Sequence, residues 1–135
     1  MIEVKNLVKL YGNHAAVDSL SFTVETGKVV GFLGPNGAGK STTMNMITGY
    51  IAPTSGTVLI DGVDMEEDPE KVRRNIGYLP ENPPLYPDMR VREYLYFVAE
   101  LKKVARNKRD VMVNEIMNRT KIVDVSERLI RHLSK

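Results

Sequence analysis

The sequence predicts an α/β protein in which a mixed β-sheet core is followed by a helical region. Three observations lead to this prediction. Residues 2–5 and 20–24 alternate apolar and polar side chains, which is typical of half-buried strands. Residues 29–33 form an unbroken apolar run, which is typical of a strand covered on both faces. From residue 91 onward, apolar residues recur at helical spacing.

A helix and a further strand are expected after the apolar run. The helix extends from residue 40 to about residue 47, and the strand at residues 57–60 follows a Pro-Thr-Ser-Gly turn. Asp61-Gly62 then predicts a tight turn, because this pair readily adopts the backbone conformation that such turns require. This interpretation makes Asp61 a turn residue rather than a residue that holds magnesium through water.

A short helix and a short strand complete this part of the chain. Asp68 is suited to cap the helix and Pro69 to open it, so a helix is expected to about residue 74. The strand is expected at residues 76–79. Four prolines between residues 80 and 87 then separate it from the helical stretches, which lie near residues 91–101, 113–117 and 129–133. We therefore divide the chain into residues 1–84 and residues 85–135.

The segment before the first helix carries the strongest motif. Residues 34–41 read Gly-Pro-Asn-Gly-Ala-Gly-Lys-Ser and match the phosphate-binding loop (P-loop) pattern G-x-x-x-x-G-K-[S/T]. The glycines let the backbone turn its N–H groups toward anionic phosphates, and the following helix adds the positive end of its dipole. The predicted nucleotide-binding residues of the loop itself are Gly34, Asn36, Gly37, Ala38 and Gly39.

The three residues that end the motif have distinct expected roles. Lys40 is expected to reach the β and γ phosphates as a point charge. Ser41 offers a hydroxyl to Mg²⁺, a hard cation that prefers oxygen ligands. Thr42 is expected to make a further phosphate contact. Residues 1–84 are therefore predicted to be a nucleotide-binding core.

Composition excludes several other classes of protein. The net charge is only +2, which argues against a dominant electrostatic role toward nucleic acid or membranes, although local patches remain open. Cysteine is absent, so neither disulfides nor thiolate chemistry is expected. No secretory signal and no membrane-spanning apolar run is visible, so we expect a cytoplasmic chain. The basic residues between Lys102 and Arg109 are interpreted as a solvated helix end, with contact to an acidic partner as the alternative.

The residues described so far resemble the ATPase domain of ATP-binding cassette (ABC) proteins. The likeness runs from Met1 to Lys135 and includes residues 34–42 and the segment Ser-Gly-Thr-Val-Leu-Ile-Asp-Gly at residues 55–62. It implies the fold of the P-loop NTPases, with a mixed sheet, an antiparallel β-subdomain and the start of a helical subdomain, and a site for ATP and Mg²⁺. It also implies that Tyr11 stacks on adenine and that Val17 flanks the ring; packing at a strand end is the alternative for Tyr11.

Residues 76–81 resemble the strand that leads to the family's glutamine loop. Glu81 stands where that loop normally has glutamine, and a carboxylate also ligates magnesium, so the expected metal ligands are Ser41 and Glu81. The stretch from residue 82 to residue 95 is similar to the ATPase subunits of ABC-2 type exporters.

The end of the chain resembles the opening of the family's signature motif. His132-Leu133-Ser134-Lys135 matches its first residues, and Ser134 would contact a γ-phosphate bound by a partner subunit. The resemblance places the catalytic glutamate beyond Lys135, so we assign no catalytic residue and regard residues 85–135 as part of an incomplete helical subdomain. We expect ATPase activity of a full-length parent protein and an inactive chain on its own.

The resemblance favours the energising subunit of an exporter. Such a subunit would form a homodimer or heterodimer of ATPase domains and lie on the inner face of the cell membrane through a membrane-spanning partner, with no nucleic acid expected. A soluble ABC-type ATPase that acts on nucleic acid or ribosomes is the alternative. A GTPase or nucleotide kinase of the P-loop class is a third interpretation, and the absence of an Asp-x-x-Gly switch motif argues against a GTPase.

Overall fold

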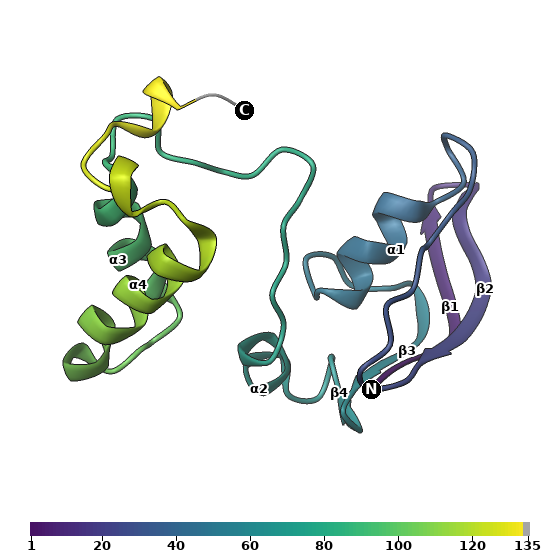
Figure 1. The fold of residues 1–135 in the computed structure, drawn as a ribbon. Coiled ribbons are helices and arrows are strands. Elements are labelled where there is room, and N and C mark those ends of the chain that lie inside the picture. The colour runs from purple at the N-terminus through teal and green to yellow at the C-terminus, as the bar shows by residue number, and fades with distance from the viewer. Residues whose placement is uncertain (134–135) are drawn as a thin grey trace. The chain divides into compact units, whose positions relative to one another are not determined.

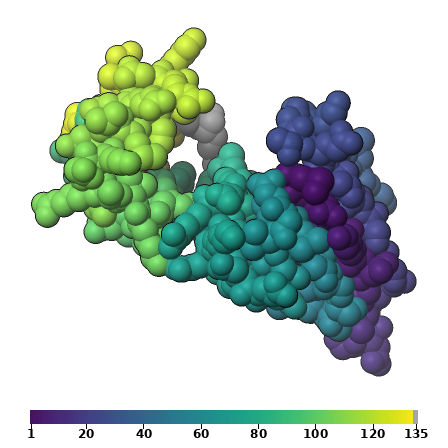
Figure 2. Space-filling view, turned by 90° about the horizontal axis from the view of Figure 1, so that it is seen from below, coloured from purple at the N-terminus to yellow at the C-terminus, as the bar shows by residue number. Residues whose placement is uncertain are grey.

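The computed structural model describes residues 1–133, which form two compact units, one from Met1 to Tyr78 and one that begins at Leu79. Figure 1 shows the elements and Figure 2 shows the same chain as filled spheres, with the first unit in purple to teal and the second in green to yellow. The first unit contains β1 (Ile2–Tyr11), β2 (His14–Val24), α1 (Lys40–Ile47), β3 (Ser55–Ile60), β4 (Val63–Asp64) and α2 (Pro69–Arg74). The second contains α3 (Val91–Leu101), α4 (Arg106–Thr120) and the 3₁₀ turns η1 (Val123–Val125) and η2 (Ile130–His132).

The first unit is built on a four-stranded sheet in the order β2-β1-β3-β4, and every neighbouring pair in it is antiparallel. Val4 in the centre of β1 pairs with Phe22 of β2 and with Val58 of β3. Asp61 and Gly62 join β3 to β4 with φ values of 50° and 78°. Positive φ at both residues is what a type I′ hairpin turn requires, so the predicted turn is confirmed.

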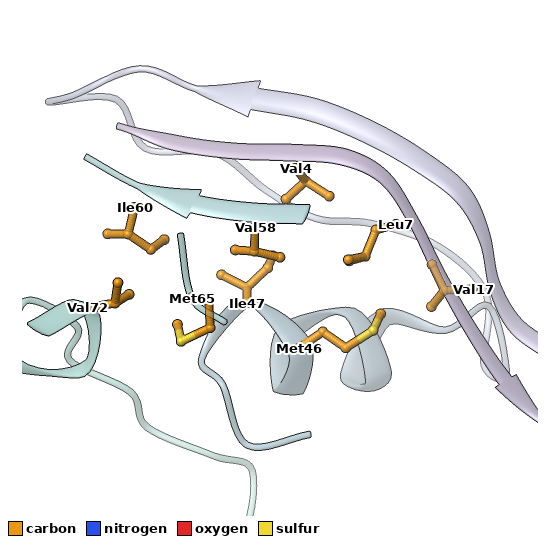
Figure 3. Packing of buried hydrophobic residues seen from close by; sticks show 9 residues of the cluster. All are labelled: Val4, Leu7, Val17, Met46, Ile47, Val58, Ile60, Met65 and Val72. Carbon is orange, nitrogen blue, oxygen red and sulfur yellow. The ribbon is translucent and has the colours of Figure 1, made fainter. Parts of the chain in front are cut away.

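The core of the first unit lies between one face of this sheet and the helices α1 and α2. Figure 3 shows the buried side chains of the strands pointing toward those of α1. The spacing of Thr43, Met46 and Ile47 places three residues on one face of α1, and all three are buried. The other members of the apolar cluster are Val4, Leu7, Val17, Val58, Ile60, Met65 and Val72.

Two predicted strands are wrong for the described residues. Residues 29–33 and 76–79 are in neither a strand nor a helix. Val29 and Leu33 are 102% and 91% exposed. Phe32, in the same apolar run, packs against Phe22, and their ring centroids are 5.7 Å apart. An apolar run predicts burial, but a strand forms only where a neighbouring strand accepts and donates its backbone hydrogen bonds, and the described residues provide none here.

Two α-helices form the second unit, as predicted for residues 91–101 and 113–117. Arg90 caps α3 together with Glu93, whose carboxylate accepts the Arg90 N–H at 2.8 Å. The helix predicted near residues 129–133 is wrong, because only the 3₁₀ turn η2 forms there. The backbone N–H groups of Ile130 and Arg131 donate to the carbonyls of Met89 and Pro87, which holds this segment beside the start of α3.

Polar pairs join α3 to α4 in antiparallel register. Arg92 donates to Asn114 at 3.2 Å, and the Tyr96 hydroxyl donates to the Asp110 carboxylate at 2.6 Å. This hydrogen bond raises the pKa of Tyr96 above 10.0, because ionised Tyr96 would lose it and face a negative charge. An aromatic residue of α3 packs against the segment before the helix, since the ring centroids of Tyr86 and Phe97 are 5.3 Å apart. Among the described residues, no helix is both long and apolar enough to cross a membrane.

The core predicts how leucine truncations will differ. Leu7 is fully buried in β1, whereas Leu101 at the end of α3 is 65% exposed. Leu7→Ala should lower the free energy of unfolding by about 2–5 kcal/mol, because it removes buried methyl groups and leaves a cavity. Leu101→Ala is the matched control and should change it by less than about 0.5 kcal/mol. Urea unfolding followed by circular dichroism measures both, and equal midpoints would contradict this account of the core.

Candidate nucleotide-binding site

The P-loop leads directly into α1. Gly37 and Gly39 have φ values of 84° and 79°, and Gly39 is the N-cap of the helix. No side chain caps this helix end, and the first helical hydrogen bond runs from the Thr43 N–H to the Gly39 carbonyl at 2.8 Å. The N–H groups of residues 40–42 therefore precede the helical ladder and are available to an anion.

Local charge also suits an anion. Residues 27–60, which include the loop and all of α1, contain no Asp or Glu. Residues 31–38 are exposed, so a ligand can reach the loop from solvent. Uncapped N–H donors, a lysine and the absence of nearby carboxylates in the sequence form a donor set that fits phosphate groups.

A close approach to β2 fixes the position of the loop. A Cβ atom at Gly39 would lie 2.2 Å from the Ala16 carbonyl oxygen and 3.1 Å from Cγ2 of Val17. Only glycine fits at this distance, and its positive φ also favours glycine. The last glycine of the motif is therefore needed for packing against the sheet as well as for the turn of the loop.

Lys40 turns back over the loop. Its Nζ donates to the carbonyls of Gly34 at 2.7 Å and Pro35 at 2.6 Å. The Ala38 N–H donates to Pro35 at 3.2 Å and closes the same turn. The ammonium group thus lies inside the curve of the loop, where phosphate oxygens could compete for its protons.

The remaining loop residues differ in exposure. Asn36, Gly37 and Ser41 are exposed, so the Ser41 hydroxyl is open to a metal-bound nucleotide, and Thr42 is half-buried. Sequence reasoning missed Thr43, which is 1% exposed and donates its hydroxyl to the Gly39 carbonyl at 2.9 Å. Its spacing to the buried face of α1 was the signal that could have identified it.

Tyr11 and Val17 occupy the β1–β2 hairpin. Tyr11 ends β1 opposite His14 and is 53% exposed, with Nζ of Lys9 5.4 Å from its ring centroid. An exposed ring of this kind has area to cover a purine. Val17 is 7% exposed and belongs to the apolar core, where it contacts the Gly39 region. The roles of both side chains beside adenine stay predictions.

The predicted magnesium ligands are Ser41 and Glu81. Glu81 is exposed and lies in the second unit, in a stretch that forms neither helix nor strand. That Glu81 and Ser41 together ligate magnesium stays a prediction. Within residues 1–133 no group of three or more His, Cys, Asp or Glu side chains could hold a metal by itself. Ser134 of the predicted signature motif lies outside the described residues.

An α/β fold with a glycine loop at the N-terminus of a helix defines a P-loop nucleotide-binding domain. A profile of the ABC transporter family matches residues 17–135. The chain therefore belongs to the ABC transporter family, as a P-loop ATPase domain, which confirms the resemblance and the predicted fold class.

Individual relatives agree with this assignment. The chain is 44% identical over 97 residues to the "Probable multidrug ABC transporter ATP-binding protein YbhF" of Escherichia coli (strain K12), a match that covers 72% of this chain and 17% of that protein. It is 38% identical over 132 residues to the "Carnitine transport ATP-binding protein OpuCA" of Listeria monocytogenes serotype 1/2a (strain 10403S), covering 96% of this chain and 32% of that protein.

A solved structure has the same fold. The ATP-binding cassette MJ0796, described as a dimer in a post-hydrolysis state with ADP and Pi, superposes with a TM-score of 0.83 at 25% identity. The match covers 99% of this chain and 63% of that one. The chain thus spans about a sixth to a third of the two curated relatives, so the activity of a whole protein is treated below as a proposal.

The packing of Gly39 predicts a sharp difference between two glycine substitutions. Gly39→Ala should lower the free energy of unfolding by at least about 3 kcal/mol, because the new Cβ collides with the Ala16 carbonyl. Gly27 is the matched control, since it has a φ of 78° and nothing lies within 4 Å of a Cβ built there. Gly27→Ala should cost only about 1–2 kcal/mol, from φ alone. Urea unfolding tests the difference, and similar losses would show that the close approach is not restrictive.

Proposed function

We propose that this chain binds MgATP as the nucleotide-binding part of the ATPase subunit of an ABC transporter, which couples ATP binding and hydrolysis to export through a separate membrane subunit. The observation that carries the proposal is the uncapped N-terminus of α1, with the Lys40 ammonium held inside the loop that precedes it. Membership of the ABC transporter family supports ATP as the nucleotide.

Different residues of the chain would bind different parts of the nucleotide. The N–H groups of the loop and of the first turn of α1 would bind phosphate oxygens, and Lys40 would exchange its bonds to the Gly34 and Pro35 carbonyls for bonds to the β and γ phosphates. Ser41 and Glu81 would hold the magnesium ion, which when bound neutralises phosphate charge. Tyr11 would cover one face of adenine.

Hydrolysis, dimerisation and transport belong to the proposed whole protein. The dimeric MJ0796 cassette with ADP and Pi supports ATPase activity and a dimer of ATPase domains for that protein. The name of YbhF refers to a multidrug transporter and the name of OpuCA to carnitine transport, so the cargo would differ within the family and would be chosen by the membrane subunit. We accordingly propose a cytoplasmic location on the inner face of the membrane.

The first binding test concerns the loop lysine. Lys40→Ala should weaken binding of a fluorescent ATP analogue in the presence of Mg²⁺ by at least about ten-fold, because a charged hydrogen-bond donor to phosphate is lost. Lys71→Ala is the matched control, since Lys71 is an exposed lysine on α2 of the same unit, and it should bind normally. Fluorescence titration measures both variants, after circular dichroism has shown that they fold. Unchanged binding in Lys40→Ala would remove Lys40 from its proposed role.

The second binding test separates base recognition from phosphate recognition. Tyr11→Ala should weaken ATP binding by about 1–3 kcal/mol through loss of stacking, while affinity for inorganic tripolyphosphate stays unchanged. Tyr11→Phe keeps the ring and should bind ATP normally. Competition titrations with the fluorescent analogue report both ligands. If Tyr11→Ala weakens both ligands equally, the tyrosine supports the hairpin and does not contact the base.

A further inference from the structure

The link between α3 and α4 is the most strongly basic stretch of the chain. Residues 101–109 read Leu-Lys-Lys-Val-Ala-Arg-Asn-Lys-Arg, with five cationic side chains and no acidic one. The two units also differ in charge: residues 1–78 contain seven Lys and Arg against nine Asp and Glu, and residues 79–135 contain twelve against eight. The low net charge of the chain therefore results from a negative first unit and a positive second unit.

Hydrogen bonds and ion pairs fold this stretch into the tip of a helical hairpin, which we call the basic tip (residues 101–109). Nη1 of Arg109 lies 3.4 Å from the Glu100 carboxylate, and its Nε donates to the Val104 carbonyl at 2.9 Å. Figure 1 shows α3 and α4 side by side within the second unit. The link between them is only four residues long, so the basic side chains gather at one end of the pair.

The acidic residues nearest to the tip are engaged within the hairpin. Glu100 pairs with Arg109, and Asp110 accepts the hydroxyl proton of Tyr96. Lys102, Lys103, Arg106 and Lys108 are exposed. The five cations of the tip outnumber these two carboxylates, so the net charge at this end of the hairpin is positive.

Exposed aliphatic side chains border the same cations. Leu101 is 65% exposed at the end of α3, and Val111 is 69% exposed one turn into α4. Cations beside exposed aliphatic groups suit the boundary between anionic headgroups and acyl chains, where both kinds of side chain are satisfied. An acidic polypeptide would match the charge of the tip but would leave Leu101 and Val111 without an apolar contact.

We propose that the basic tip of the α3–α4 hairpin docks on the anionic surface of a lipid membrane, with Arg106 and Lys108 against phosphate headgroups and Leu101 and Val111 against the acyl boundary. This contact would be made by the second unit itself. It needs neither nucleotide nor a membrane-spanning subunit, so its failure would leave the proposed ATP binding untouched.

Sedimentation with vesicles tests the proposal on the nucleotide-free protein. The protein should bind vesicles of phosphatidylcholine with one quarter phosphatidylglycerol and should not bind pure phosphatidylcholine vesicles. Binding should weaken as NaCl is raised from 50 to 500 mM, because salt screens the headgroup charge. Equal binding to both kinds of vesicle would overturn the proposal.

Two charge-reversal pairs locate the contact. Arg106→Glu with Lys108→Glu should weaken binding to anionic vesicles by at least about ten-fold, since each basic residue near such a surface is worth about five-fold in affinity. Negative charge in the first turn of α4 also favours the helix, so the pair should remain folded. Arg119→Glu with Lys121→Glu makes the same change in net charge at the other end of α4 and should bind almost normally.

Circular dichroism verifies that each variant is folded. If the helix content of the Glu pair falls, Arg106→Gln with Lys108→Gln replaces it. This milder pair should also weaken vesicle binding by at least about ten-fold. Equal losses in the tip pair and the control pair would overturn the proposal, because net charge alone would then explain binding. Retention on immobilised polyglutamate without vesicle binding would also overturn it and would assign the tip to an acidic polypeptide.

Discussion

The packing of α1 on the antiparallel sheet is the interaction on which the candidate site depends. Gly39 touches the backbone of β2 on one side and begins α1 on the other, while Thr43, Met46 and Ile47 anchor the helix in the core. A loop of eight residues with three glycines has many conformations in isolation. Because its last glycine is held against the Ala16 carbonyl, the direction of the helix N-terminus is set by the sheet.

This packing leaves the first N–H groups of α1 without a hydrogen-bond acceptor from a capping side chain. The helix has no side-chain cap, although a Ser, Thr, Asp or Asn cap would have stabilised it. Gly39 cannot supply one, because any side chain there would collide with β2. The same glycine thus permits the close approach and leaves the first N–H groups to an external acceptor. Lys40 meanwhile satisfies the Gly34 and Pro35 carbonyls, which stabilises the loop without occupying its N–H donors.

Local patterns predicted the elements whose stability is local. The Asp68 cap of α2 and the Asp61-Gly62 turn follow from capping and turn chemistry, and the helix from residue 40 to 47 follows from the pattern of its sequence. The structure contains each of them. Residues 29–33 were predicted as a strand from an apolar run, and residues 76–79 from a short apolar segment that also resembles a strand of the family. Strand formation requires a partner at hydrogen-bonding distance, and composition cannot say which partner is present. In the candidate site, the loop residues follow from a motif. The contact of Gly39 with Ala16 and the burial of Thr43 depend instead on tertiary packing.

In the hairpin of α3 and α4, partly buried and exposed charged groups have different roles. Arg92, Tyr96 and Arg109 direct their polar groups to partners on the other helix or its link, which fixes the antiparallel register. Glu100 and Asp110 take part in these pairs, and the five cations of residues 101–109 outnumber them. The pairs that set the register of the hairpin therefore lie beside a tip whose net charge is positive, because its five cations exceed the two neighbouring carboxylates in number.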